Sequence, residues 1–424
     1  MDTLQKWIVP ENYHQLPSQV EGITAFAPKA VKTKEHDLRT YKCPKCGATT
    51  KFDVAASDVA CEHCGYSAEA DSQTVGRSAA QQEFTLEALS LAEQGWGIER
   101  KTLTCENCGA VTSLPEDVLS TSCPFCASNK VNIGAAIDDT LRPKFLIPFK
   151  VSPEKTQSLA KEWLGKGWYH PPELASNSLI QNFNGIYLPY WTFDAKIDAA
   201  WRAQVGHTRT VRDKDGHSRT VVDWRWEKGQ KHLAIDDMPQ SGTTKVSHHI
   251  LKGLLPFRFD ALNAYSPDFL AGWQALNFNI ALPDAWEEAK ENMRESAHQA
   301  CRAQIHSSHV HNFSMTANFE DEEWRYILLP IYLAVYKHEG KVFQVMVNGQ
   351  TGAVSGQKPV AWWKIWLAIA AMLLPGLLLG MIGLPLLLLG GAGAVVISFG
   401  FILLVFGGVG SVLLYKKAAD SERA

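Results

Sequence analysis

Eight cysteines are the residues of this chain whose type and spacing can do chemistry. They form four Cys-x-x-Cys pairs, and fourteen residues separate the two pairs of each half. The second half repeats the first at an offset of 62 residues, cysteine for cysteine. The eight positions are Cys43, Cys46, Cys61, Cys64, Cys105, Cys108, Cys123 and Cys126.

This spacing predicts two metal sites with four thiolate ligands each. The tight turn of a Cys-x-x-Cys pair directs both sulfurs the same way, and a following glycine allows the left-handed backbone that turns amides toward the thiolates. Two such turns at the ends of a short hairpin complete a tetrahedral site, the pattern of a structural zinc ribbon. We therefore expect two structural Zn2+ ions, one in a ribbon at residues 39–68 and one in a ribbon at residues 101–131.

Other uses of these cysteines fit less well. The regular double repeat disfavours disulfides and thioredoxin-like redox pairs, whereas rubredoxin-like iron uses similar turns and is the main competitor. His63 and Asn107 lie inside the pairs, but four thiolates already close each site, so neither is expected to be a ligand. A closed site leaves no position for a substrate, and we expect these metals to fold the protein and not to catalyse. Using eight of nine cysteines in this way suits a reducing compartment.

The C-terminal part of the chain predicts a transmembrane hairpin at residues 362–415. No charged residue occurs from Ile365 to Tyr415, a run of 51 residues. Because one bilayer core takes about 20 helical residues, we expect two spans, at about 365–389 and 394–415, joined by a glycine-rich turn. The alternative, a buried hairpin of a soluble protein, is disfavoured by the length and purity of the run.

Lysines at both ends of this run predict its orientation. Lys364, Lys416 and Lys417 flank the two spans, so the positive-inside rule places both termini in the cytoplasm, with residues 416–424 as a cytoplasmic tail. The first residues carry no apolar run, and no secretory signal peptide is expected. Within the first span, Gly376 and Gly380 form a GxxxG pair that permits close helix packing.

The rest of the sequence predicts an α+β multidomain fold. Residues 1–38 are an irregular lead-in, residues 69–100 a helical linker with a helix at about 81–94, and residues 140–357 a β-rich α+β domain. The elements expected in that domain are a strand at 145–151, a helix at 153–164 capped by Ser152, strands at 185–191, 205–212 and 219–226, a helix at 285–304, and strands at 326–336 and 342–347.

A short repeat within this domain has two interpretations. The segment Ile186–Trp191 (IYLPYW) resembles Ile327–Tyr332 (ILLPIY), and each precedes a predicted β-hairpin. One interpretation is a duplicated strand unit that forms a single sheet. The other is coincidence, because Leu-Pro before a strand is common.

A histidine cluster also has two interpretations. His298, His306, His309 and His311 fall close together around Cys301, and alternation would place His309 and His311 on one strand face, where they could chelate a metal. The more ordinary interpretation is solvated polar residues at a sheet edge. Cys301 lies in a predicted helix, where a cysteine is more often a small core residue than a nucleophile.

Composition and missing motifs narrow the possible functions. The formal net charge is −3, and the two ribbon loops carry mainly acidic side chains, so neither is a basic patch for nucleic acid. The sequence contains no phosphate-binding loop, HExxH, GxSxG or GxGxxG motif. We therefore expect a protein that is not an enzyme and has no catalytic residues.

The layout resembles a bacterial family of membrane-anchored double zinc-ribbon proteins. The resemblance rests on the eight ribbon cysteines, on Leu188–Trp191 (LPYW), and on Val347–Gly352 (VNGQTG) just before the membrane hairpin, and it covers most of residues 40–415. It implies a place in the bacterial inner membrane and partners of the SPFH (stomatin/flotillin-like) or PspA type in membrane-stress assemblies.

The leading expectation is a non-enzymatic adaptor or scaffold that recruits such cytoplasmic partners to the inner membrane. The alternative is a membrane-tethered zinc-ribbon regulator that binds nucleic acid. A third possibility is a hydrolase that uses the histidine cluster.

Overall fold

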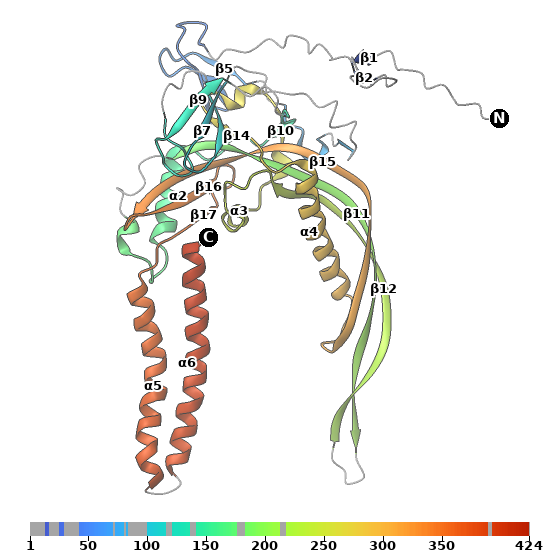
Figure 1. Cartoon of the computed structure of the whole chain (residues 1–424), viewed down its shortest axis with the longest axis vertical. Coiled ribbons are helices and arrows are strands. Elements are labelled where there is room, and N and C mark those ends of the chain that lie inside the picture. The colour runs from blue at the N-terminus through green and yellow to red at the C-terminus, as the bar shows by residue number, and fades with distance from the viewer. Residues whose placement is uncertain are drawn as a thin grey trace, which may run out of the picture. The chain divides into compact units, whose positions relative to one another are not determined.

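A computed structural model of the chain describes most of its residues (Figure 1). The described ranges are 13–16, 25–28, 42–70, 73–79, 82–83, 100–115, 121–135, 141–175, 183–212, 218–388 and 392–423. Most of the predicted linker helix at 81–94 lies outside them. Its described residues contradict that prediction, because Gln82–Glu83 form a short strand, β6, that pairs with the edge of β15 (Val310–His338).

The chain divides into two units, Met1–Arg39 and Thr40–Ala424. In the first unit, β1 (Tyr13–Leu16) pairs antiparallel with β2 (Ala25–Pro28). The second unit holds both cysteine clusters, a sheet-rich body and two C-terminal apolar helices, which confirms the predicted α+β class.

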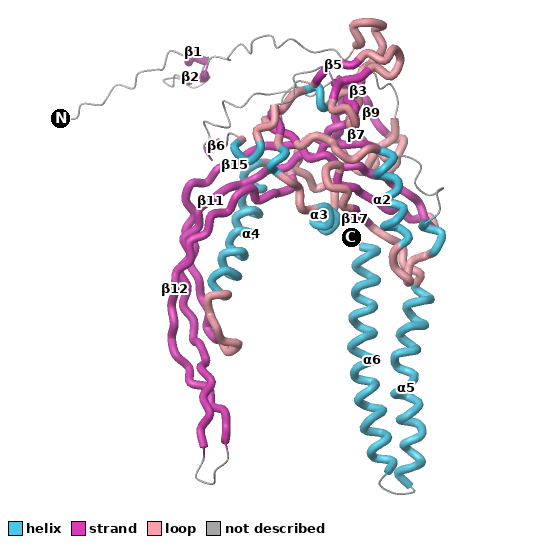
Figure 2. The backbone as a smooth tube through the Cα atoms, turned by 180° about the vertical axis from the view of Figure 1, so that it is seen from behind, coloured by secondary structure: helices cyan, strands magenta, loops and turns pink. Residues whose placement is uncertain are grey.

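The body of the second unit is built on one twelve-stranded sheet. Its longest strands are β11 (Asn184–Arg212), β12 (Ser218–Ser241) and β15, with β11 paired antiparallel to both of the others (Figure 2). The remaining strands besides β6 are β7 (Arg100–Cys105), β8 (Val111–Pro115), β9 (Val131–Ala135), β10 (Phe145–Leu146), β13 (Asn263–Ala264), β14 (Gln274–Leu276), β16 (Lys341–Asn348) and β17 (Val354–Gly356).

The second cysteine ribbon is part of this sheet. Strands β7, β8 and β9 carry that ribbon, and β8 pairs with β14, so the sheet crosses the division that the sequence placed between residues 131 and 140. The first ribbon instead forms its own three-stranded sheet of β3 (Lys51–Asp53), β4 (Asp58–Ala60) and β5 (Ser67–Glu69).

The arrangement of the short repeat, at the centre of the sheet, favours the interpretation as a duplicated strand unit. The two segments pair directly with one another, antiparallel, with Leu188 opposite Leu329. The first strand of each half continues as a hairpin, β11 into β12 and β15 into β16. Each of the two strands also has a short strand beside it that pairs with it in parallel over two residues. Strand β14 pairs in this way with β11, and β10 with β15.

Equivalent hydrogen bonds hold the two halves of this duplication. The N–H of Gly242 donates to the carbonyl of Pro189 (2.9 Å), and the N–H of Gly349 donates to the carbonyl of Pro330 (2.9 Å). Side chains repeat the pattern in two further bonds: Trp191 Nε1–H to the carbonyl of Ile280 (3.1 Å), and Tyr332 O–H to the carbonyl of Val151 (2.7 Å). These contacts favour duplication over coincidence.

Each half also carries a helix after its short parallel strand. Helix α2 (Pro153–Gly165) begins as predicted, with Ser152 Oγ accepting from the N–H of Lys155 (3.3 Å). Helix α4 (Leu282–Arg302) lies along β11 (Figure 1) and buries one face at four-residue spacing, through Ala285, Ala289, Met293, Ala297 and Cys301. Within the described ranges, the body also contains helix α3 (His248–Leu254) and 3-10 turns at Gly76–Ser78, Pro172–Ala175, Phe259–Ala261 and Pro267–Leu270.

Several predicted strands have different lengths in the structure, among them those expected at 219–226 and 326–336, which extend to Ser218–Ser241 and Val310–His338. The strand expected at 145–151 ends after Leu146, because Pro148 has no N–H and the amides of Lys150 and Val151 turn to the carbonyl of Gly349 instead. The strands expected separately at 185–191 and 205–212 form one continuous strand, β11.

Candidate metal centres

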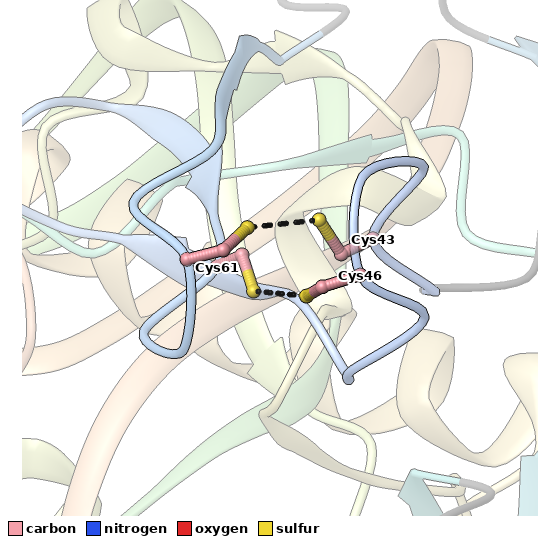
Figure 3. Close-up of side chains that lie close together, drawn as sticks. Cys43, Cys46 and Cys61 are labelled. Carbon is pink, nitrogen blue, oxygen red and sulfur yellow. Dashed lines mark hydrogen bonds between the residues drawn. The ribbon is translucent and has the colours of Figure 1, made fainter.

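The first cysteine cluster brings four sulfurs together from the two ends of a small hairpin. Cys43 Sγ lies 3.4 Å from Cys64 Sγ, and Cys46 Sγ lies 3.6 Å from Cys61 Sγ, as Figure 3 shows. The second cluster repeats this arrangement, with 3.6 Å between Cys105 Sγ and Cys126 Sγ and 3.6 Å between Cys108 Sγ and Cys123 Sγ.

These distances fit one metal ion per cluster. In each cluster the four sulfurs all lie within 4.8 Å of one another. A tetrahedron with metal–sulfur bonds of about 2.3 Å has sulfur–sulfur edges of about 3.8 Å. All nine cysteines of the chain are described, and all nine are free thiols. The structure therefore brings together all eight predicted ligands in two sites that can hold two metal ions.

The same backbone turn presents the sulfurs in all four pairs. In each turn the N–H four residues after the first cysteine donates to that cysteine's carbonyl, at 2.8–2.9 Å. The donor residue has a positive φ in every case: 73° at Gly47, 69° at Gly65, 66° at Gly109 and 55° at Ala127. Three of the four positions are therefore glycine for the reason that the sequence indicated, and Ala127 adopts the same conformation against its preference.

Proton affinities show why a cluster favours a cation. Desolvation raises the pKa of Cys43, but backbone N–H groups of Lys45 and Cys46 outweigh it and bring that pKa to about 7. The N–H of Ala48 lowers the pKa of Cys46, yet desolvation and the neighbouring sulfurs outweigh it and raise that pKa to about 12. One thiol thus ionises readily and the next resists, so a bound cation is needed to hold four thiolates together.

The two clusters differ in their surroundings. In the second, the carbonyl of Phe125 accepts from Gln344 Nε2 (2.6 Å) and the carbonyl of Cys108 accepts from Lys245 Nζ (3.1 Å), which ties both turns to the body. In the first, Cys46 and Cys64 are exposed. The first ribbon contacts the body through its hairpin, where Phe52 packs on Phe269 at 5.1 Å between ring centroids. Its metal-binding turns therefore face solvent.

A third cluster of possible ligands already holds a cation from the protein. The carboxylates of Asp194, Asp236 and Asp237 converge where β11, β12 and β15 bulge. The side chain of Arg325, only 1% exposed, lies between them, 3.1 Å from Asp194 and 2.8 Å from Asp237. Burial raises the pKa of Asp194 to about 6, although the N–H of Asp237 and the Arg325 guanidinium oppose that shift.

Sequence reasoning missed this cluster. Its signals were the pair Asp236-Asp237 near the end of a strand and a lone arginine, Arg325, entering a buried strand. We infer a structural role, because the arginine takes the place that a metal ion would need.

The histidine cluster does not form a site within the described residues. His298 packs against Phe313 (4.8 Å between ring centroids), and His311 against Trp224 (4.3 Å). No group of converging ligand atoms includes a histidine among the residues that the structure describes. Cys301 is fully buried on the core face of α4, and burial raises its thiol pKa, which confirms the prediction of a core residue.

Two C-terminal helices form the predicted apolar hairpin. They are α5 (Trp362–Leu388) and α6 (Ala392–Arg423), and they fit a membrane protein with two spans. Only 11% of the most apolar window of each helix is buried inside the protein. An apolar hairpin of a soluble core would bury most of its surface, so the exposed faces favour a bilayer as their surroundings.

Glycines let the two helices approach closely, in a different pattern from the one predicted. A Cβ at Gly376 would lie 2.8 Å from the carbonyl oxygen of Gly400, and one at Gly407 would lie 2.5 Å from that of Met372. A Cβ at Gly380 would meet nothing within 4 Å. The contact therefore uses glycines seven residues apart, at 376 and 383 on α5 and at 393, 400 and 407 on α6. Of the predicted pair, Gly380 contributes only its backbone, whose N lies 3.1 Å from a Cβ placed at Gly400.

The base of the hairpin is attached to the body. The N–H of Lys358 donates to the carbonyl of Ser421 (2.8 Å), and Trp362 Nε1–H donates to Glu422 Oε2 (3.1 Å). Lys358 Nζ also donates to the carbonyls of Trp163 and Lys166, the latter at 3.0 Å, at the C-terminus of α2. Both helices thus join the body at one end of the hairpin.

Comparison with known proteins finds a bacterial relative. The chain is 24% identical over 335 residues to the uncharacterized protein YdjG of Bacillus subtilis (strain 168). The alignment covers 77% of this chain and 92% of that protein. No family model matches the chain. No solved structure matches it. The name of the relative states no function, and function is therefore inferred from the geometry of this chain.

Proposed function

We propose that this chain is a membrane-anchored zinc-ribbon adaptor that recruits cytoplasmic partners to the bacterial inner membrane. One observation carries the proposal: two closed four-cysteine clusters and a two-span apolar hairpin are attached to the same body. Closed clusters offer no reaction site, and the hairpin supplies an anchor. What remains for the chain to do is to hold a rigid protein surface at the bilayer.

We assign zinc to both clusters. Four thiolates in a tetrahedral arrangement are a usual structural zinc site, because Zn2+ is a d10 ion that has no ligand-field preference against this geometry and no redox chemistry. Rubredoxin-like iron would use the same ligands, so metal analysis decides between them. In the second cluster the metal would stabilise the edge of the central sheet, and in the first it would hold an exposed ribbon in shape.

The proposed orientation places both termini in the cytoplasm. Lys364 precedes the first span and Lys416 and Lys417 follow the second, so the cations lie at the end of the hairpin that joins the body. The cysteine-bearing body then lies in the cytoplasm, where free thiols stay reduced and available to metal.

The proposed partners are SPFH-type or PspA-type membrane-stress proteins, and the first ribbon is the proposed docking element. Its turns face solvent, with Lys45 Nζ 5.6 Å from the ring centroid of Tyr66. A ribbon that a metal ion holds rigid can bind a partner at low entropic cost, because its loops are already ordered before the partner binds.

Purification of the tagged full-length chain in mild detergent tests the proposal. The wild type is expected to recover an SPFH-type or PspA-type protein and to carry two zinc ions. The double variant Cys46→Ser, Cys64→Ser should lose one ion and the partner while keeping the second ion. The variant Cys301→Ser, which removes a cysteine outside both clusters, is the control and should match the wild type.

Two results would contradict the adaptor. One is a wild-type chain that carries its metals and recovers no such partner. The other is a first-ribbon double variant that has lost its ion and still recovers the partner in full.

A further inference from the structure

The distal parts of the three long strands carry a charge unlike that of the whole chain. We call this segment the β-arm and define it as residues 196–212, 218–232 and 310–319. It holds eight lysines and arginines and three aspartates and glutamates, a net charge of +5, whereas the chain as a whole has −3. An anionic surface is the partner that such a segment attracts.

The two faces of the β-arm are chemically distinct. On β11, odd-numbered side chains from Ala195 to Val205 are buried on the face that packs on α4, so even-numbered ones point to the opposite, outer face. Cross-strand register places Arg202 beside Lys228, and Gly206 beside Trp224, on that outer face. Of these residues, Arg202, Lys228 and Trp224 are exposed to solvent, and Gly206 is buried.

Among the described residues, carboxylates pair with cations on both faces of the β-arm, including the outer-face Lys196 with Asp321 at 2.6 Å, but not with the neighbouring outer-face cations Arg202 and Lys228. Arg209, an odd-numbered residue, pairs with Asp223 at 2.5 Å. No described carboxylate forms an ion pair with Arg202 or Lys228. Arg202 instead donates from Nε to Ser314 Oγ (3.3 Å) and lies over the ring of Trp226, 5.7 Å from its centroid.

A hollow of about 790 Å³ is lined by both of these cations and by residues further along the same strands. Ala200 lines it, and its small side chain leaves room between the side chains of Gln230 and Thr316, its partners on the two neighbouring strands. The polar side chains of the lining are those of Arg202, Lys228, Gln230, Ser314 and Thr316, and no carboxylate is among the lining residues. Guanidinium, ammonium and hydroxyl groups are the donors that bind phosphate oxygens.

Two large aromatic side chains lie on the same outer face, Trp226 next to Arg202 and Trp224 further toward the tip of the β-arm. Trp226 is 58% exposed and Trp224 is 43% exposed, which is unusual for tryptophan in a soluble setting. Exposed indoles next to lysine and arginine are typical of surfaces that lie at the water–lipid boundary, where the ring sits among headgroups and the cation meets phosphate.

We propose that the outer face of the β-arm docks onto an anionic phospholipid surface, with a headgroup phosphate in the hollow and the two indoles at the boundary. The proposal rests on the membrane hairpin but not on the zinc assignment or on the protein partners. The hairpin brings the arm to a bilayer at high effective concentration, which makes lipid the favoured anionic partner over nucleic acid.

Vesicle flotation tests the proposal with the full-length chain held in discs of pure phosphatidylcholine. Vesicles of phosphatidylcholine carrying about a third phosphatidylglycerol should capture the wild type, and capture should weaken with added salt. Vesicles of phosphatidylcholine alone should not. The double variant Arg202→Gln, Lys228→Gln should bind about 25-fold more weakly, from roughly fivefold for each cation at an anionic lipid surface. Trp226→Thr should weaken capture without changing charge.

A control variant separates the effect of the outer face from the effect of net charge. Arg209→Gln, Lys231→Gln removes the same charge from odd-numbered positions, on the α4 face, and should retain most of the capture. Equal loss in both double variants, or equal capture by neutral and anionic vesicles, would overturn the proposal. So would an outer-face variant that loses binding to a single-stranded oligonucleotide but keeps vesicle capture. Metal content and partner recovery should stay unchanged in every variant.

Discussion

At the scale of single residues, the four metal-binding turns differ at one position. Ala127 adopts φ 55° where the equivalent positions are Gly47, Gly65 and Gly109. A left-handed conformation costs a residue with a Cβ roughly 1–2 kcal/mol relative to glycine. The second cluster therefore carries backbone strain that the first does not.

Replacing this alanine should stabilise the protein. Ala127→Gly is expected to raise the free energy of unfolding by about 1 kcal/mol, because the strain it removes exceeds the added entropy of the unfolded chain. Denaturant unfolding of the metal-loaded protein in detergent measures the change. Gly65→Ala is the reverse substitution at a site where a Cβ meets nothing within 4 Å, and it should lower stability. A destabilised Ala127→Gly protein would rule out this account of the turn.

The buried arginine predicts a large effect of a different kind. Arg325→Met leaves the buried carboxylate of Asp237 without its cation and should cost about 3–5 kcal/mol of stability. Arg77→Met removes an exposed partner of Asp236 and should cost less than about 1 kcal/mol. Thermal unfolding of the two variants compares them. Similar losses in both would contradict the assignment of Arg325 as the central cation.

Lys358 predicts a dependence on pH where the hairpin meets the body. Burial lowers its pKa to about 8, with Lys166 adding to the shift, whereas an unfolded lysine titrates near about 10.4. Between these values the unfolded chain binds more protons than the folded one, so this residue's contribution to stability rises as pH increases. From about pH 8 to 9.5, wild type should gain stability relative to Lys358→Met in thermal unfolding. A difference that stays constant with pH would contradict the burial of this ammonium.

Sequence reasoning found some of these residues and not others, for a physical reason. The eight cysteines were predictable because their spacing is local: the turn that unites each pair spans a few residues. Arg325 was not, because Asp194 and Asp237 lie far from it in the sequence and only strand register brings them together. The ordinary interpretation of Cys301 held because helical periodicity is also local.

At the scale of elements, the contact between α5 and α6 depends on glycines at heptad spacing. Gly407→Ala places a Cβ 2.5 Å from the backbone oxygen of Met372 and should cost about 1–3 kcal/mol through overpacking. Gly408→Ala is the matched control, since a Cβ there meets nothing within 4 Å and the change in helix propensity is the same. Thermal unfolding in detergent separates the two. Equal effects would mean that the helices do not pack along this face.

Hairpins were predictable as elements, and the extent of the sheet was not. Alternation of polar and apolar residues indicated the paired strands on either side of residues 213–217, and Glu339-Gly340 indicated the turn between β15 and β16. The sequence left open whether the two Leu-Pro segments were related. Their direct pairing, and the glycine that satisfies each proline's carbonyl, required contacts between residues that are not neighbours in the sequence, such as Leu188 with Leu329 and Pro189 with Gly242.

At the scale of the whole molecule, the second ribbon and the central sheet form one structure. The sequence divided them because metal-binding turns and strand alternation are separate signals. Pairing of β8 with β14 joins them, and Gln344 ties a turn of the second cluster to β16. Loss of the second metal should therefore disturb the sheet more than loss of the first, whose ribbon forms a sheet of its own.

The account as a whole depends on two thiolate clusters in a chain that a hairpin holds at a membrane. Elemental analysis of the full-length protein extracted from the membrane fraction tests this most directly. We predict two zinc ions per chain and recovery of the protein only after detergent is added. Protein that is free of metal, or that is recovered from the soluble fraction without detergent, would contradict it.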